Sequence, residues 1–224
     1  MPFDAILIDF YGTITAGDRE AVEAACARIV RECNLPATPQ AFAIEWGERF
    51  FATVAASNHD DFRTLYECEL TSLEATLAAR GVRRDPRPFV ADLEAYWSDP
   101  PLHADAVAFL SRVKVPVCCV SNADTAHVAG VIERHGLRFN ALITSEDVRC
   151  YKPEAGIFQS AMDRLGVRPE RAVHIGDSLH SDIGGAAALG IATAWLCRES
   201  RIHDIGTCPA DHTISSLDEL AHWF

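Results

Sequence analysis

Short apolar segments recur along the chain, and turn-forming residues bound each of them. They span residues 5–9, 115–120, 141–144, 172–176 and 192–196. Each is rich in Val, Ile, Leu, Ala or Cys, which is typical of strands that are buried on both faces of a sheet. The pattern therefore predicts five buried strands.

Helical patterns alternate with these strands in the second half of the chain. Residues 125–135 place Val128, Val131 and Ile132 on one face of a helix, and residues 154–165 show the same kind of spacing. Strands that alternate with helices form right-handed β-α-β units with parallel strands. We therefore predict an α/β fold with a Rossmann-like, mainly parallel sheet.

The stretch between the first two strands follows a different pattern, because it contains no convincing strand. Amphipathic helices are predicted there at 19–33, 39–55, 60–80 and 86–96. An all-helical block inserted after the first strand looks like a cap over an active site. We therefore predict two domains: an α/β core of residues 1–15 and 96–224, and a helical cap of residues 16–95.

The charge of the chain argues against several classes of function. The 224 residues carry a formal net charge of −12, which repels nucleic acids and anionic membrane surfaces. No apolar run approaches the roughly 18 residues that span a bilayer, and the N-terminus does not resemble a signal peptide. We therefore expect a cytoplasmic monomer or homodimer that binds neither nucleic acid nor membrane.

The spacing of the cysteines and the small number of lysines limit the possible chemistry of the site further. The eight cysteines include no C-x-x-C pair, so we expect structural or incidental thiols. Lys114 and Lys152 are the only lysines. If the partner is a small anionic substrate, the positive charge that receives it must come from Lys152, a few arginines or a metal ion.

Polar residues with catalytic potential follow four of the predicted strands. In an open parallel sheet, ligands bind beyond the carboxyl ends of the strands. In chain order the residues at these ends are Asp9 and Thr13, Ser121 and Asn122, Lys152, and the pair Asp177 and Asp182. Taken singly, each is an ordinary turn or helix cap. Taken together, in this order, they predict one site at one edge of the sheet.

This order of motifs resembles the haloacid dehalogenase superfamily, a group dominated by phosphatases. The resemblance covers the whole chain and includes a helical cap inserted after the first strand. It implies hydrolysis through a covalent intermediate on an aspartate, here Asp9. Thr13, Ser121 and the backbone N–H groups that follow Asp9, as at Gly12, would bind phosphoryl oxygens, with Asn122 beside them.

The resemblance also implies a cofactor. Magnesium would lie between Asp9, the carbonyl oxygen of Tyr11 and Asp177. Lys152 would hold Asp9 and the phosphate together against their mutual repulsion. Asp182 would hold the waters of the metal or the lysine.

One position departs from the phosphatase pattern. Most phosphatases of the superfamily carry a second Asp, which acts as general acid and base, where this chain has Tyr11. The tyrosine is a feature of the 2-haloacid dehalogenases, whose first motif reads D-x-Y-G-T. Those enzymes work without metal and carry Ser-Ser-Asn where this chain has Asp177, Ser178 and Leu179, and they carry a Tyr where it has Phe158.

These departures leave three alternatives for the function. A magnesium-dependent phosphatase that acts on a small phosphorylated metabolite is favoured. A metal-independent 2-haloacid dehalogenase that forms an ester on Asp9 is the second, and a non-catalytic binding protein is the third. A phosphatase without the general acid would need a good leaving group, or a proton from the cap or the substrate.

Two arginines of the predicted cap are candidates for substrate binding. Arg49 and Arg63 would contact an anionic substrate, or the halide in the dehalogenase alternative. Phosphonoacetaldehyde hydrolysis, a further reaction of the superfamily, needs a cap lysine. Residues 16–95 contain no lysine, which argues against it.

Overall fold

A parallel sheet forms the centre of the computed structural model, which describes residues 3–198, 208–220 and 223. Within these residues the sheet has six strands in the order β3-β2-β1-β4-β5-β6, and all of its pairings are parallel. The strands are β1 (Ala5–Ile8), β2 (Val117–Ser121), β3 (Ala141–Thr144), β4 (Ala172–Gly176), β5 (Ala192–Leu196) and β6 (His212–Ile214). The predicted α/β fold with a parallel, Rossmann-like sheet is confirmed.

Two differences from the predicted strands have simple causes. β2 begins at Val117 because Pro116 has no amide hydrogen to donate to a neighbouring strand. β6 is not predicted by the apolar pattern, since two of its three residues are exposed at the edge of the sheet. The other predicted strands agree with the structure to within one residue.

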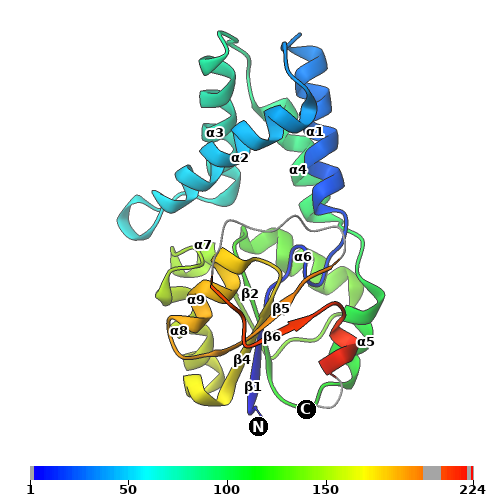
Figure 1. The fold of residues 1–224 in the computed structure, drawn as a ribbon, viewed down its shortest axis with the longest axis vertical. Coiled ribbons are helices and arrows are strands. Elements are labelled where there is room, and N and C mark those ends of the chain that lie inside the picture. Colours follow the sequence, from blue (N-terminus) through cyan, green and yellow to red (C-terminus); the bar gives the residue numbers. More distant parts are fainter. Residues whose placement is uncertain (1–2, 199–207, 221–222, 224) are drawn as a thin grey trace.

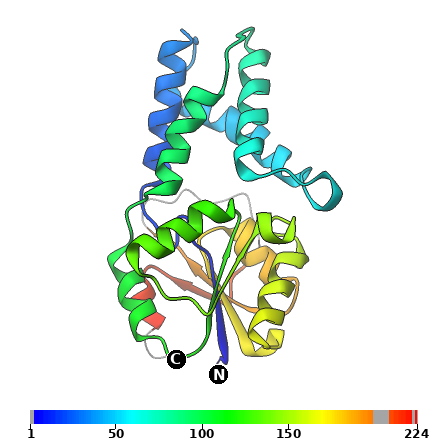
Figure 2. The ribbon, with the colours of Figure 1, turned by 180° about the vertical axis from the view of Figure 1, so that it is seen from behind.

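Helices cover both faces of the sheet (Figures 1 and 2). Ile6 and Ile8 on β1 belong to one hydrophobic cluster and Leu7 belongs to another, as the alternation of side chains along a strand requires. The first cluster includes residues of α5 (Ala104–Arg112), α6 (Thr125–His135) and η4 (Leu217–Leu220), and the second includes residues of α8 (Ala155–Leu165) and α9 (Gly185–Ala187). The shorter elements are α7 (Ser145–Val148), η2 (Pro169–Arg171) and η3 (Leu179–Gly184).

A helical cap lies over the carboxyl ends of the strands (Figures 1 and 2). Its elements are α1 (Asp18–Glu32), α2 (Pro39–Ala55), η1 (His59–Asp61), α3 (Leu65–Ala79) and α4 (Arg87–Ser98). These helices share a hydrophobic cluster of their own, which includes Phe42, Trp46, Leu73 and Phe89. The chain leaves the core after β1 and returns to it after α4.

The ends of two cap helices differ from the prediction. The helix predicted from residue 60 begins at Leu65, because the hydroxyl oxygen of Thr64 and the carboxylate of Glu67 form a capping box there. Helix α4 continues to Ser98, so a domain boundary at residue 95 would fall inside it. We therefore place the end of the cap after Ser98.

Two expectations based on composition can be compared with the structure. All eight cysteines are free thiols, and Cys118 and Cys119 are buried in β2. Among the described residues, no helix combines the length and the apolar character that crossing a membrane requires.

Candidate active site

The candidate site lies where the three central strands end. β2, β1 and β4 are neighbours in the sheet, so the residues that follow them lie side by side. Asp9 follows β1, Ser121 ends β2, and Asp177 follows β4. Asp9, Ser121 and Asp177 are all buried. The order of the strands thus places at one edge residues that are far apart in the sequence.

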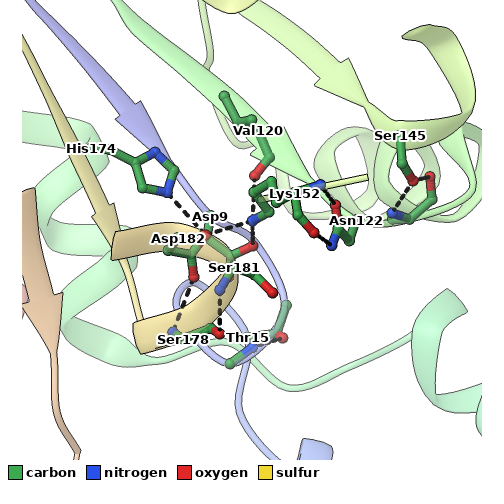
Figure 3. Close-up of polar contacts among 12 residues, drawn as sticks. Asp9, Thr15, Val120, Asn122, Ser145, Lys152, His174, Ser178, Ser181 and Asp182 are labelled. Atoms are coloured by element: carbon green, nitrogen blue, oxygen red, sulfur yellow. Dashed lines mark hydrogen bonds and ion pairs between the residues drawn. The ribbon is translucent and has the colours of Figure 1, made fainter. Parts of the chain in front are cut away.

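Lys152 is the centre of the polar contacts in Figure 3. Its Nζ atom donates to Asp9 Oδ1 at 2.6 Å, to Asp182 Oδ1 at 2.7 Å and to the carbonyl oxygen of Val120 at 3.0 Å. These three acceptors use all three donors of the ammonium group. Because Lys152 is also buried, its charge is held in one place.

Asn122 holds the backbone of Lys152 in position. Its Oδ1 atom accepts from the amide of Lys152 at 2.7 Å, and its Nδ2 atom donates to the carbonyl of Lys152 at 3.0 Å. This pair of bonds joins the turn after β2 to the segment after α7. Through these two bonds, Asn122 supports the backbone of the lysine.

Asp182 is fixed from several sides. Besides Lys152, its Oδ1 atom lies 2.9 Å from His174 Nε2, and its Oδ2 atom accepts from the amide of Ser178 at 3.1 Å (Figure 3). Gly176 makes room for it, because a Cβ atom at that position would overlap the carboxyl group of Asp182. The position of Asp182 therefore depends on Lys152, on His174 and Gly176 of β4, and on the amide of Ser178.

Sequence reasoning missed His174. The residue is fully buried in the middle of β4, where its ring contacts Asp182 on one side and Phe158 edge-on, with ring centroids 5.1 Å apart. A histidine inside the apolar run 172–176 is a signal that could have revealed it. Buried polar side chains need partners, and the acids Asp177 and Asp182 of the predicted site follow His174 closely in the sequence.

The charges in the site shift the ionisation of its members in opposite directions. Burial works against the Lys152 ammonium, but the charges of Asp182 and Asp9 outweigh it and raise the pKa of Lys152. Burial alone would raise the pKa of Asp182, yet Lys152 and the hydrogen bond from His174 hold it well below its usual value. Burial raises the pKa of Asp9 in spite of its bond to Lys152. One lysine therefore does not fully compensate two buried carboxylates.

The acids of the site can hold a divalent cation. Ligand atoms of Asp9, Asp177 and Asp182 all lie within 4.8 Å of one another. The Oδ2 atom of Asp9 is buried and has no hydrogen-bond partner among the described residues. Three carboxylates face one ammonium group, and carboxylate oxygens are the ligands that magnesium prefers. The donor set and its charge therefore fit a magnesium ion.

The loop after Asp9 turns sharply and carries a second unpaired polar atom. Gly12 adopts a left-handed conformation, with φ of 84°, that favours glycine. The hydroxyl oxygen of Thr13 is buried and has no hydrogen-bond partner among the described residues. The amides of Gly12 and Thr13 already donate within the loop, to Thr15 Oγ1 and to the carbonyl oxygen of Phe10. The Thr13 hydroxyl can therefore donate to an oxygen of a bound anion.

The side chain of Tyr11 is directed to the cap. Its hydroxyl donates to the carbonyl oxygen of Trp97 at 2.7 Å, and its ring lies 6.2 Å from the ring of Tyr96. Burial raises the pKa of Tyr11, so the phenol stays protonated and remains a donor. Tyr11 therefore fastens the loop after Asp9 to the end of α4.

A family model of haloacid dehalogenase-like hydrolases matches residues 3–190. The chain belongs to the haloacid dehalogenase-like hydrolase family.

Relatives of this hydrolase include more than one activity. (S)-2-haloacid dehalogenase 4A from Burkholderia cepacia is 25% identical over 226 residues, which cover 96% of this chain and 92% of the relative. Pyrimidine 5'-nucleotidase YjjG from Escherichia coli (strain K12) is 36% identical over 121 residues, which cover 51% of this chain and 53% of the relative. With several curated relatives, the match spans only about half of their length or less. Family membership alone therefore does not separate the two reactions.

A solved structure supports the fold of the hydrolase over its whole length. The HAD-hydrolase YfnB from Bacillus subtilis, a structure bound to magnesium, superposes with a TM-score of 0.78 at 21% identity, over 99% of this chain and 98% of that chain. At 21% identity, this similarity supports the fold of the core and the cap, and only the fold.

The two arginines predicted to bind substrate lie in different settings. Arg49 is on α2, where its side chain is 42% exposed and pairs with Glu45 of the same helix at 3.5 Å. Arg63 is exposed in the segment before α3, and its carbonyl oxygen accepts from the hydroxyl of Tyr151 at 2.8 Å. Arg63 thus lies next to the residue that precedes Lys152. Substrate binding by Arg49, Arg63 and Gly12 stays a prediction.

Proposed function

We propose that this hydrolase is a magnesium-dependent phosphatase, which acts on a small phosphorylated metabolite through an aspartyl-phosphate on Asp9. The observation that carries the proposal is the buried cluster of Asp9, Asp177 and Asp182 around one lysine. Asp177 adds a third carboxylate to the two that Lys152 already pairs with. A dianionic substrate can enter such a cluster only if further positive charge is bound there.

Different residues of the chain have different roles in the proposed reaction. An oxygen of Asp9 attacks phosphorus, the bond from phosphorus to the leaving oxygen breaks, and water later attacks phosphorus to release phosphate and restore Asp9. Lys152 stabilises the charge on Asp9 and on the phosphoryl oxygens, while Thr13 and Ser121 bind those oxygens. Magnesium, held by Asp9, Asp177 and the carbonyl oxygen of Tyr11, would supply the charge that lets an anionic phosphate approach a carboxylate.

The leaving group of the proposed substrate follows from Tyr11. The Tyr11 hydroxyl already donates its hydrogen to the carbonyl oxygen of Trp97, and burial raises the pKa of Tyr11, so the phenol is too weak an acid to replace a carboxylic acid that protonates a leaving alkoxide. Loss of such an acid costs about 10²-fold to 10⁴-fold in rate. We therefore expect an aryl, enol or acyl phosphate to be hydrolysed faster than an alkyl phosphate. Equal rates on aryl and alkyl phosphates would contradict this part of the proposal.

A metal-independent 2-haloacid dehalogenase is the second candidate. Two observations favour it: Tyr11 matches the first motif of those enzymes, and the similarity to (S)-2-haloacid dehalogenase 4A extends over 92% of that protein. In this alternative Asp9 would attack carbon and displace a halide, which leaves without a proton. The alternative gives Asp177 no part in the reaction.

The test compares p-nitrophenyl phosphate with 2-chloropropionate, each with Mg²⁺ and with EDTA. We expect release of phosphate that EDTA abolishes. Release of chloride that EDTA does not affect would overturn the proposal in favour of the dehalogenase. A protein that turns over neither compound, and whose behaviour is unchanged in Asp9→Asn, would point to the non-catalytic alternative.

Asp177→Asn gives a second test with a matched control. We expect the rate of phosphate release to fall by about 10²-fold or more, because the variant removes a metal ligand and its charge. Asp163→Asn, the same change at an exposed position on α8, should leave the rate unchanged. An active Asp177→Asn enzyme that releases phosphate in EDTA would contradict the assignment of the metal site.

A further inference from the structure

The cap contacts the core through the segment between α2 and α3, at some distance along the chain from its two covalent connections. We call residues 58–66 the docking segment. It includes η1 and the first residues of α3, and it reaches two core segments, one after β2 and one after α7.

The first contact is made with Tyr151. Asn58 Oδ1 in the docking segment accepts from the amide of Tyr151 at 2.7 Å, and the Tyr151 hydroxyl donates to the carbonyl oxygen of Arg63 at 2.8 Å. The rings of Tyr151 and Phe62 stack, with centroids 5.3 Å apart and 21° between their planes. Tyr151 is 1% exposed, so this core residue is enclosed by the cap.

The second contact is made with Asp124. Its Oδ1 atom accepts from the amide of Leu65 at 2.6 Å, and its Oδ2 atom accepts from the amide of Tyr66 at 3.1 Å. These amides begin α3, where a helix has unpaired N–H groups and a positive dipole end. A carboxylate of the core therefore anchors a helix of the cap.

A third pair of bonds lies beside them. The amide of His59 donates to the carbonyl oxygen of Arg149 at 2.8 Å, and Arg149 Nε donates to the carbonyl oxygen of His59 at 3.2 Å. The docking segment thus holds the backbone of the core at residues 149 and 151, immediately before Lys152.

The docking contacts at Tyr151 and at Asp124 both lie beside the hydrogen bonds that hold the backbone of Lys152. The amides of Tyr151 and Lys152 follow one another, and each donates to an asparagine side chain, that of Asn58 from the cap and that of Asn122 from the core. Asp124, the anchor of α3, is two residues beyond Asn122 in the same turn. The position of the cap and the position of Lys152 are therefore coupled through two short backbone segments.

We infer that Tyr151 is a positioning residue, through which the docked cap holds Lys152 against Asp9. The inference rests on the proposed role of Asp9 and Lys152 in hydrolysis. A purely structural role for Tyr151 would affect the stability of the protein and leave the reaction at Asp9 as it is. The coupling instead requires that loss of the docking contacts displaces Lys152 and slows the chemical step.

Asn58→Ala and Tyr151→Phe test the coupling, with the substrate that the wild-type protein turns over, p-nitrophenyl phosphate or 2-chloropropionate. We expect kcat to fall by about 10-fold to 100-fold, because small displacements of catalytic groups cost this much, while KM changes less. Asn58→Asp keeps the acceptor for the Tyr151 amide and should retain most of kcat. Thr38→Ala removes the cap of α2 at the end of that helix far from the docking segment, and should leave kcat unchanged.

Hydrogen exchange supplies a readout that does not need turnover. In Asn58→Ala and Tyr151→Phe, amide exchange at residues 149–152 and 154 should be faster than in the wild type, and in Thr38→Ala it should be unchanged. This readout keeps the test valid if neither substrate is turned over. Unchanged kcat and unchanged exchange, with only a lower Tm, would overturn the inference.

Discussion

Lys152 carries one positive charge, and two carboxylates share it. Asp182 also receives hydrogen bonds from His174 and Ser178, whereas Asp9 keeps an oxygen that has no partner among the described residues. A buried carboxylate without full compensation lowers the stability of the fold. The same lack of partners leaves Asp9 available to a metal ion and to an electrophile, which is what a nucleophile requires.

Gly176 is the residue on which the position of Asp182 depends most directly. In Gly176→Ala, the new Cβ would overlap the Asp182 carboxyl group, so we expect the free energy of unfolding to fall by about 1–3 kcal/mol and turnover to be lost. Gly130→Ala is the control, because a Cβ there has no heavy atom within 4 Å and lies in α6. Alanine should stabilise that helix by about 0.5–1 kcal/mol. Urea unfolding and kcat measurements would check both variants, and an active Gly176→Ala enzyme would contradict the expectation.

Tyr11→Phe separates the hydroxyl of Tyr11 from its ring. The hydroxyl bonds to the carbonyl oxygen of Trp97, so its removal should cost about 1 kcal/mol in the free energy of unfolding. Because the hydroxyl is directed to the cap, we expect kcat to change only a few-fold. A fall in kcat of about 100-fold without a change in cap docking would instead mean that the phenol takes part in the chemistry.

Among the elements, α3 connects the two parts of the molecule and also carries a buried acid. Its first amides bind Asp124 of the core, and one turn later Glu69 is 9% exposed within the cap. Burial, with a smaller contribution from the charge of Asp18, raises the pKa of Glu69 to about 8. The helix that docks on the core therefore contains a carboxyl group that is neutral below this pH.

Glu69 should make the stability of the protein depend on pH. The unfolded chain releases this proton near pH 4.5 and the folded chain near pH 8, so stability falls as the pH rises between these values, by roughly 1.4 kcal/mol per unit. Glu69→Gln should remove this dependence and stabilise the protein by a few kcal/mol near pH 8. Glu74→Gln, at an exposed position of the same helix, should leave the pH dependence as it is. Urea midpoints at pH 5, 7 and 9 would decide, and parallel curves for Glu69→Gln and wild type would contradict the expectation.

At the scale of the whole molecule, the protein has a net charge of −12, although its site is proposed to receive an anion. The charge of the protein repels such a substrate at a distance, and the positive charge that attracts it lies under the cap at Lys152 and the proposed metal site. Long-range repulsion is screened by salt, whereas contacts within the buried site are screened much less.

Salt should therefore affect association more than chemistry. Between about 10 mM and 150 mM ionic strength, the screening length falls from about 30 Å to about 8 Å. We expect kcat/KM for p-nitrophenyl phosphate to rise a few-fold over this range, with little change in kcat. A choline salt would serve as the control for an effect specific to sodium. A fall in kcat/KM would mean that the local field at the mouth of the site is positive.

The amino-acid pattern by itself determined the α/β class, five of the strands and the order of the polar residues at their ends. These features are local, because a buried strand needs an apolar run, and a parallel sheet brings the ends of its strands to one edge. The predicted boundaries failed where a local contact ended an element, as at Pro116 and Thr64, or where an edge strand was mostly exposed, as in β6.

Only the tertiary structure decided how these residues meet. The bond between Lys152 and Asp9 joins positions 143 residues apart, and the docking of Asn58 on Tyr151 joins positions 93 residues apart. The partner of His174, the direction of Tyr11 and the anchoring of α3 by Asp124 likewise depend on contacts across the fold. No periodicity or spacing encodes such contacts, since they arise from the order of the strands and from the way the cap packs on the core.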